Sequence, residues 1–371
     1  MGLGDRVKGL FGGKPSYRSM DEAVAAINEG ETGAPVDWVR SQAESGDIRA
    51  QKVMFELCRH GVGMSADMDV AIDWLEKAAE QGDEDVQRRI ASILSSDDSP
   101  WRDPGRALPW VRLVAERGDS FMQLILGTFH LRGEAVEKNL DEARRWFDRA
   151  AEQGELDGRF AIGLAHEKGD HLPQDWGEAL RIYGEIAEQG SGRALHKLGM
   201  LHMLGEGVEK DLPVAVSYFE RAAADGVTHA MMTLGDLHSG EELGPPDHEE
   251  SVKWYRMAAE HDDGEAWYHV GQAHDLGRGA EQDYLKACEA FAEAAKLDYD
   301  LGKVALGTKY VNGDGVIQDL PHAYALFFLV ARETEDEEAR SEARRLLTEI
   351  ADHLTPDQRA EAQQNILNWS A

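Results

Sequence analysis

The chain repeats one pattern of apolar and polar positions every 36 residues. Each copy ends a helical run at a turn residue, and these residues are Gly46, Gly82, Gly118, Gly154, Gly190, Gly226, Asp262 and Asp298. A fixed period of this length is typical of proteins built from stacked structural repeats. The pattern therefore predicts a row of similar units.

The helical run before each turn residue carries two features. One is a pair of small or apolar residues: Ala78-Ala79, Val114-Ala115, Ala150-Ala151, Ile186-Ala187, Ala222-Ala223, Ala258-Ala259, Ala294-Ala295 and Val330-Ala331. The other is a residue four positions earlier, which is large and apolar in most repeats: Trp74, Trp110, Trp146, Ile182, Tyr218, Trp254, Ala290 and Leu326. This spacing predicts one helical face, with Ala290 as the weak member of the column.

The helical run after each turn residue contains an apolar residue followed by glycine. The pairs are Leu126-Gly127, Ile162-Gly163, Leu198-Gly199, Leu234-Gly235, Val270-Gly271 and Leu306-Gly307. Glycine inside a helix costs about 1 kcal/mol relative to alanine. Its recurrence predicts a place where a neighbouring helix leaves no room for a side chain.

A loop follows this helix and ends at an acidic or amide residue. The residues at this position are Asp67, Asp103, Asn139, Asp175, Asp211, Asp247, Asp283 and Asp319. Asp and Asn cap the free amides at the start of a helix. Each repeat is therefore predicted to be helix, loop, helix and turn.

The stretch "LG..H..GEGVEKDLPVAVSYFERAAADG" resembles the Sel-1-like repeat family, which is related to the tetratricopeptide repeats. The resemblance covers most of the chain, from Val36 to Glu333. It implies an all-α fold: a right-handed α/α superhelical solenoid of about eight 36-residue repeats, whose first helices line a concave face. It also implies a scaffold or adaptor that binds proteins.

The pattern divides the chain into four parts. We expect a flexible tail over residues 1–20, a partial repeat or cap over 21–46, the repeat array over 47–333 and two capping helices over 334–371. Two loops depart from the glycine-rich form. They are "SSDDSPWRDPG", which contains Pro104, and "EELGPPDHEE", in which Pro245 and Pro246 stiffen the loop.

Helical geometry indicates which side of each first helix faces outward. Positions three, six, ten and thirteen after the turn residue form that side. We expect a peptide groove with an apolar floor of Phe121, Leu124, Leu131, Phe160, Leu164, Met200, Met203, Met232 and Tyr268. A basic end for a carboxylate would consist of Arg49, Lys52, Arg59 and Arg88. The alternative is that much of this floor is ordinary core between repeats.

A column of histidines lies twelve residues after the turn residues. It contains His130, His166, His202, His238 and His274, and Tyr310 follows where the family prefers tyrosine. Neighbouring repeats stack about 10 Å apart, too far for two members to share a metal ion. The histidines are either a pH-responsive spine or hydrogen-bonded replacements for tyrosine in the helix interface.

Composition narrows the classes of function. A formal net charge of −31 excludes a nucleic-acid binder, because such a protein needs a surplus of Lys and Arg. Only Cys58 and Cys288 are present, which predicts buried thiols in a reducing compartment. No stretch has the length and apolarity of a signal peptide or a membrane span, so we expect a soluble cytoplasmic protein.

No motif indicates catalysis, a metal or a cofactor. HExxH, GxSxG and CxxC are absent, and "GLFGGKPS" fails as a phosphate loop because Lys8 and Pro15 occupy required positions. We therefore expect a non-enzymatic scaffold that binds a peptide or helix of a partner protein on its concave face. One alternative is a regulator or immunity-type inhibitor that covers a folded partner. Another is a scaffold that contacts a membrane through residues 1–18.

Overall fold

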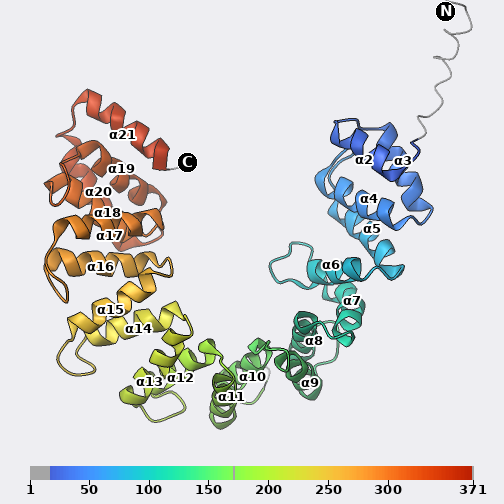
Figure 1. Cartoon of the computed structure of the whole chain (residues 1–371), viewed down its shortest axis with the longest axis horizontal. Coiled ribbons are helices and arrows are strands. Elements are labelled where there is room, and N and C mark those ends of the chain that lie inside the picture. Colours follow the sequence, from blue (N-terminus) through green and yellow to red (C-terminus); the bar gives the residue numbers. More distant parts are fainter. Residues whose placement is uncertain (1–16, 170–171, 370–371) are drawn as a thin grey trace, which may run out of the picture. The chain divides into compact units, whose positions relative to one another are not determined.

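Every secondary-structure element in the described residues is a helix. The computed structural model describes residues 17–169 and 172–369, and the chain divides into two compact units, the first ending at Asp175 and the second beginning at Trp176. Figure 1 labels the helices along the chain. The N-terminal unit contains α2 (Met20–Asn28), α3 (Ala34–Glu44), α4 (Ile48–His60), α5 (Met68–Glu80), α6 (Glu84–Ser95), α7 (Pro104–Glu116), α8 (Ser120–Arg132), α9 (Leu140–Ala151) and α10 (Asp157–Lys168).

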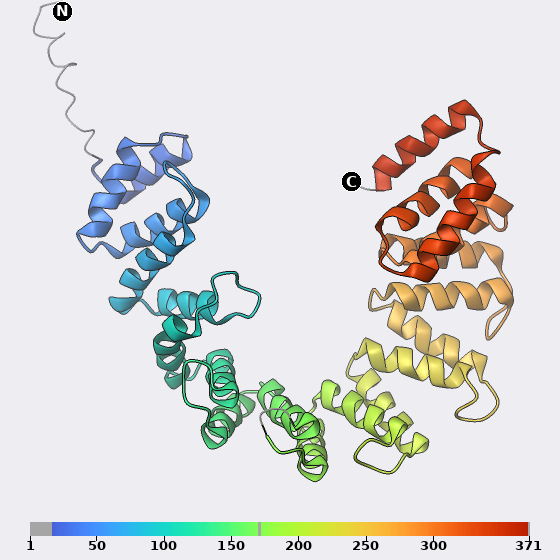
Figure 2. The same ribbon diagram turned by 180° about the vertical axis from the view of Figure 1, so that it is seen from behind.

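The C-terminal unit continues the same alternation. Its helices are α11 (Trp176–Glu188), α12 (Gly192–Leu204), α13 (Leu212–Ala224), α14 (Thr228–Ser239), α15 (His248–Ala259), α16 (Gly264–Leu276), α17 (Tyr284–Lys296), α18 (Asp300–Asn312), α19 (Leu320–Glu333), α20 (Glu337–Ala351) and α21 (Pro356–Trp369). Within each unit consecutive helices pack on one another up to α20, and α21 packs on α19 instead; Figure 2 shows the chain from behind. The predicted all-α repeat architecture is confirmed.

The predicted capping residues begin the second helix of each repeat. Asp67, for example, accepts a hydrogen bond from the backbone N–H of Val70 at 3.1 Å. The same bond is made by Asp103, Asn139, Asp211, Asp247, Asp283 and Asp319. The first helices have caps that the sequence pattern did not reveal, namely Asp47, Asp83, Asp119, Ser191 and Asp263.

The turn column has the backbone conformation that favours glycine. Gly82 has a φ of 93°, and Asp262 and Asp298 adopt φ values of 59° and 63° at the same position. The helical glycines are explained by an aromatic ring on the second helix. A Cβ atom on Gly199 would lie 2.6 Å from the Phe219 ring, and the same close approach occurs between Gly127 and Phe147, Gly235 and Tyr255, Gly271 and Phe291, and Gly307 and Phe327.

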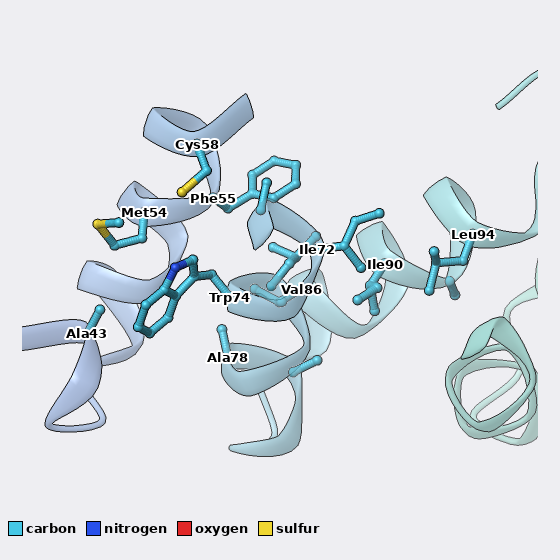
Figure 3. Close-up of a cluster of buried hydrophobic side chains, with 14 of the residues drawn as sticks. Ala43, Met54, Phe55, Cys58, Ile72, Trp74, Ala78, Val86, Ile90 and Leu94 are labelled. Carbon is cyan, nitrogen blue, oxygen red and sulfur yellow. The ribbon is translucent and has the colours of Figure 1, made fainter. Parts of the chain in front are cut away.

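A shared apolar core runs through the N-terminal unit. Figure 3 shows its first part, where side chains from α3, α4, α5 and α6 converge. Trp74, the first member of the large column, is 9% exposed and belongs to this core, as do Met54, Ala78 and Ile90. The second helix of one repeat thus packs on the first helices on both sides of it.

A polar ladder accompanies this core in the N-terminal unit. The side-chain amide of Gln87 donates to the carbonyl of Ala79 at 2.8 Å, and its oxygen accepts from Arg117 at 2.7 Å. Gln51 and Gln123 make the equivalent pair of bonds. In the C-terminal unit the same position holds Leu195, Met231 and Trp267, where apolar packing replaces the ladder. The next member of the column is Lys303, which pairs with Asp298 and lies 3.2 Å from Asp300.

The two helices predicted after Glu333 are α20 and α21, and both pack on α19. Thr355 and Gln358 form the reciprocal pair of hydrogen bonds that starts α21, at 3.0 and 3.3 Å. Cys58 and Cys288 are buried free thiols, as predicted. No helix within residues 17–169 and 172–369 has the length and apolarity needed to cross a membrane. Most of the tail predicted for residues 1–20 lies outside the described residues.

Candidate protein-binding face

Each first helix has one buried side and one outer side, as helical geometry predicts. Residues four, eight and eleven after the turn, such as Met122, Leu126 and Phe129, are buried against the partner helix. Residues three, six, ten and thirteen after the turn form a surface that we call the A-helix face. We describe it separately for α4, α6, α8 and α10 in the N-terminal unit and for α12, α14, α16 and α18 in the C-terminal unit.

The predicted apolar floor is only partly open in the N-terminal unit. Phe121 is 50% exposed, and Leu124 and Leu164 are half-buried. Leu131 and Phe160 are each 6% exposed, because neighbouring helices cover them. These two residues belong to the core between repeats, which agrees with the alternative interpretation of the floor. They present no surface to a partner.

The C-terminal unit places Met200, Met203, Met232 and Tyr268 in half-buried positions. Tyr268 is held by three aromatic neighbours, with its ring centroid 5.6 Å from that of Tyr299 and 5.8 Å from that of Phe291. Its hydroxyl accepts a hydrogen bond from Gln272 at 2.8 Å, and burial raises the pKa of the phenol. Tyr268 is therefore a fixed wall of this face.

The four residues of the predicted basic end are all paired with carboxylates. Arg49 lies 2.7 Å from Asp21, Arg88 lies 2.8 Å from Asp119 and Arg59 lies 3.8 Å from Glu56. Lys52 pairs with Asp83, and the hydrogen bond from Lys52 lowers the pKa of that carboxyl.

For Lys52 and Arg88 the cause of this neutralisation is the repeat itself. Asp83 and Asp119 are the caps of the next first helix, so the stacking of repeats carries a carboxylate to the basic side chain of the preceding repeat. The cluster of cations inferred from the sequence is thus a set of ion pairs. No free patch of positive charge exists at these four residues.

A pocket of about 360 Å³ opens on the A-helix face between α6 and α8. We call it the α6–α8 pocket. Phe121, Ile125 and Phe129 form its apolar side, and Ser92 and Ser95 line it from α6. The Ser95 hydroxyl is buried, with the residue 4% exposed, and has no hydrogen-bond partner among the described residues. An unpaired buried hydroxyl costs free energy.

Four charged side chains border the α6–α8 pocket. Arg102 pairs with Asp97 at 2.9 Å and with Glu134, and Arg132 lies 3.3 Å from Asp97 and 3.6 Å from Glu134. Partial burial of Asp97 opposes its ionisation, but the hydrogen bonds and charges of Arg132 and Arg102 prevail and lower its pKa. This network fixes the loop of residues 96–103 against α8.

A second pocket of about 340 Å³ occupies the equivalent place in the C-terminal unit, between α14 and α16. Its Asp236 and Gln272 stand 144 residues, or four repeats, after Ser92 and Thr128 of the first pocket. Tyr255 donates to Asp236 at 2.7 Å and its ring stacks on His269 with centroids 4.4 Å apart. Burial and the bond to Asp236 raise the pKa of the Tyr255 phenol.

Both pockets follow the loops that depart from the glycine-rich pattern. In a regular repeat the second glycine of the loop approaches the start of a second helix closely; a Cβ atom on Gly207 would lie 2.3 Å from the Trp176 ring. Ser99 and Leu243 replace that glycine in the two departing loops, and Ala135 and His171 replace it in two other repeats. The departures were visible in the sequence, but the pockets beside them were not.

The histidine column lies in the helix interface. His274 makes two contacts, with the carbonyl oxygen of Glu281 at 3.0 Å and with Arg256 at 3.1 Å. His166 lies 3.3 Å from Arg144, and His202 stacks on Tyr218. Burial lowers the pKa of His130. Among the described residues no group of three potential ligands is placed to hold a metal ion.

A chain of stacked helix pairs, with pockets between successive first helices, is a helical-repeat protein. The Sel1 repeat matches residues 49–83, 120–155, 157–191, 192–227, 228–263, 264–299 and 301–332. The chain belongs to the Sel1 repeat family, which confirms the resemblance inferred from its motifs. Residues 84–119, which contain the first departing loop, fall outside these matches.

Two solved structures are similar over most of the chain. A protective antigen of uropathogenic Escherichia coli that displays an SLR fold is 28% identical, with a TM-score of 0.54, and the match covers 94% of this chain and 75% of that one. A Sel1 repeat protein from Oxalobacter formigenes is 25% identical, with a TM-score of 0.57, covering 89% and 95%. Among curated proteins, none matches the chain.

Proposed function

We propose that this protein is a non-enzymatic scaffold that binds a peptide or helix of a partner protein on the A-helix face. The observation that carries the proposal is the α6–α8 pocket, which is lined by the exposed ring of Phe121 and bordered by charged side chains. Sel1 repeat proteins serve as protein-binding scaffolds, and nothing in the described residues indicates catalysis.

The chemistry of the pocket suits a peptide. An apolar side chain would bury the Phe121 ring, which supplies the large aromatic area that dominates binding energy at protein interfaces. Arg132, 42% exposed at the border, keeps a charged rim around this centre.

Site-specific photo-crosslinking in the native cell tests the proposal. A photoreactive phenylalanine analogue at position 121 is expected to capture a discrete partner, and the same analogue at Ile317, which is 90% exposed on a loop, serves as the control. Phe121→Ala should weaken binding of the captured partner at least tenfold, whereas Ile317→Ala should not change it.

Other outcomes would point to the competing functions. Capture at position 317 but not at position 121 would contradict a site on the A-helix face and favour a regulator that covers a folded partner with its loops. Loss of membrane association on deletion of residues 1–18, measured by fractionation, would favour the membrane-contacting scaffold. Residues 1–16 lie outside the part of the chain that the structure describes.

We also propose that α20 and α21 cap the repeat array and that the protein works in a reducing, cytoplasmic compartment. Ala339, Ala343 and Ile350 of α20 are buried with Phe327 and Val330 of α19, so α20 covers an apolar face that would otherwise meet water. The two buried free thiols support the compartment. Fractionation of cells that express the protein tests the location.

A further inference from the structure

A larger pocket lies away from the A-helix face, in the groove between two successive second helices. It has a volume of about 720 Å³ and is bordered by α15 and α17, with α16 at its floor. We call it the α15–α17 groove. Trp267, Val270 and Ala290 form its apolar part. Ligand pockets in proteins have volumes of roughly 300–1,000 Å³.

The groove exists because one repeat lacks its large residue. The position of Ala290 is occupied by tryptophan in four other repeats, at Trp74, Trp110, Trp146 and Trp254. Trp74 is nearly buried there and belongs to the core of its unit. Ala290 is itself buried but ends at Cβ, so the volume that an indole ring fills elsewhere is open.

The charge one turn after this position differs from that in three other repeats. A basic residue one turn after the aromatic lies over its ring in three repeats: Lys77 is 4.1 Å from the Trp74 ring, Arg149 is 4.7 Å from Trp146 and Arg221 is 5.9 Å from Tyr218. The residue one turn after Ala290 is Glu293, so this repeat lacks both the ring and the cation.

The border of the groove provides carboxylates for such a cation. Glu260 and Glu289 are exposed at the border and form no ion pair among the described residues, whereas Glu293 is paired with Lys296 at 2.6 Å. Arg256 is directed at His274, and Lys286 lies 3.4 Å from Asp283. Three charges at the border are therefore in no ion pair among the described residues, the carboxylates of Glu260 and Glu289 and the guanidinium of Arg256, so the excess is negative.

We propose that the α15–α17 groove is a second binding site, which accepts a tryptophan-like aromatic side chain of a partner protein together with an adjacent basic group. The ring replaces the missing indole over Ala290 and packs on Trp267. The basic group is bound by Glu260 and Glu289. This site is independent of the function proposed for the A-helix face, because it is built from the second helices and from the inner side of α16.

Three probes that share one ring test the proposal on the full chain. Tryptamine carries a cation, N-acetyltryptophanamide is neutral and indole-3-acetate is an anion. Saturation-transfer NMR titrations should rank their affinities in that order, with tryptamine at least threefold tighter than the neutral probe. Equal affinities, or tightest binding of the anion, would overturn the assignment of the charged border.

Ala290→Trp supplies the residue that other repeats have and is expected to fill the groove. We expect all three probes to lose at least tenfold in affinity while the melting temperature is maintained or raised. Met257→Trp is the matched control, because Met257 is 39% exposed on α15 and does not line the groove. Unchanged probe binding by folded Ala290→Trp would refute the site.

A second variant decides the question if Ala290→Trp does not fold. Glu260→Gln combined with Glu289→Gln changes only exposed border residues. It should abolish the preference for tryptamine over N-acetyltryptophanamide and leave the affinity of the neutral probe within twofold of the wild-type value. A preference that survives this substitution would show that the cation is bound elsewhere, and the proposal would fail.

Discussion

A Cβ atom on Gly127 would lie 2.5 Å from the ring of Phe147, which comes from the second helix of the same repeat. The ring occupies the space that the missing side chain leaves. The two repeats without this glycine have smaller residues at the aromatic position: Phe55 goes with Leu75, and Ala91 goes with Val111. All four of these residues are buried. In each repeat the side chains at the glycine position and at the aromatic position thus fill one shared space in the core.

Gly127→Ala is expected to lower the free energy of unfolding by about 2 kcal/mol, because the added methyl group forces the Phe147 ring to move. Chemical denaturation monitored by circular dichroism measures the loss. Adding Phe147→Val, as in the repeat with Ala91 and Val111, should make the double variant about 1 kcal/mol more stable than the sum of the single effects. Strict additivity would contradict the shared volume.

Trp254→Ala is expected to lower the free energy of unfolding by about 3 kcal/mol, because it removes a large, partly buried side chain from α15. The change copies the natural arrangement at Ala290. Leu297→Ala, at a residue that is 38% exposed, is the control and should cost less than about 0.5 kcal/mol. A loss below about 1 kcal/mol for Trp254→Ala would show that this column contributes little to packing.

Stability is expected to decrease as the pH falls from about 7.5 to 5.5. Burial lowers the pKa values of His130 and His196 in the folded chain, so the unfolded chain binds more protons once the pH drops below the ordinary histidine pKa of about 6.5. His130→Tyr, which copies Tyr310, should reduce this dependence. Urea titrations at several pH values measure it, with His353→Tyr on an exposed turn as the control. An identical pH slope in His130→Tyr and the wild type would refute the prediction.

Asp119 has two roles that can be separated. It caps α8 by accepting from the backbone N–H of Met122 at 2.9 Å, and it pairs with Arg88. Asp119→Ala should cost about 1–2 kcal/mol, whereas Arg88→Ala should cost less than about 0.5 kcal/mol because the pair is exposed on the arginine side. Asp119→Asn keeps the cap and should resemble Arg88→Ala. Equal losses in Asp119→Ala and Arg88→Ala would assign the stability to the ion pair.

Much of the fold was predictable because its determinants are local in the sequence. Two of these determinants can be recognised from a few consecutive residues. One is a turn glycine with positive φ, and the other is a capping carboxylate three residues before the amide that it binds. The helical glycines predicted a close approach, although Phe147 as the approaching residue required the structure.

The candidate sites were less predictable because they depend on neighbouring repeats. Leu131 and Phe160 have the outward phase of an open surface, yet adjacent helices bury them. Arg88 reads as a free cation until stacking brings Asp119 to it. Ala290 was visible as an exception, but the groove above it also depends on Trp267, which lies on a different helix.

The position of the Gly127–Phe147 contact has a consequence for the evolution of the chain. Both residues belong to one 36-residue period, and the equivalent contacts between Gly199 and Phe219 and between Gly271 and Phe291 are also internal to their periods. A gene duplication or deletion of one whole period therefore adds or removes both residues of a contact together. The Gln87 bond to Ala79 crosses from one period to the next, but its acceptor is a backbone carbonyl, which every period supplies, so an exchange of whole periods leaves this bond possible as well.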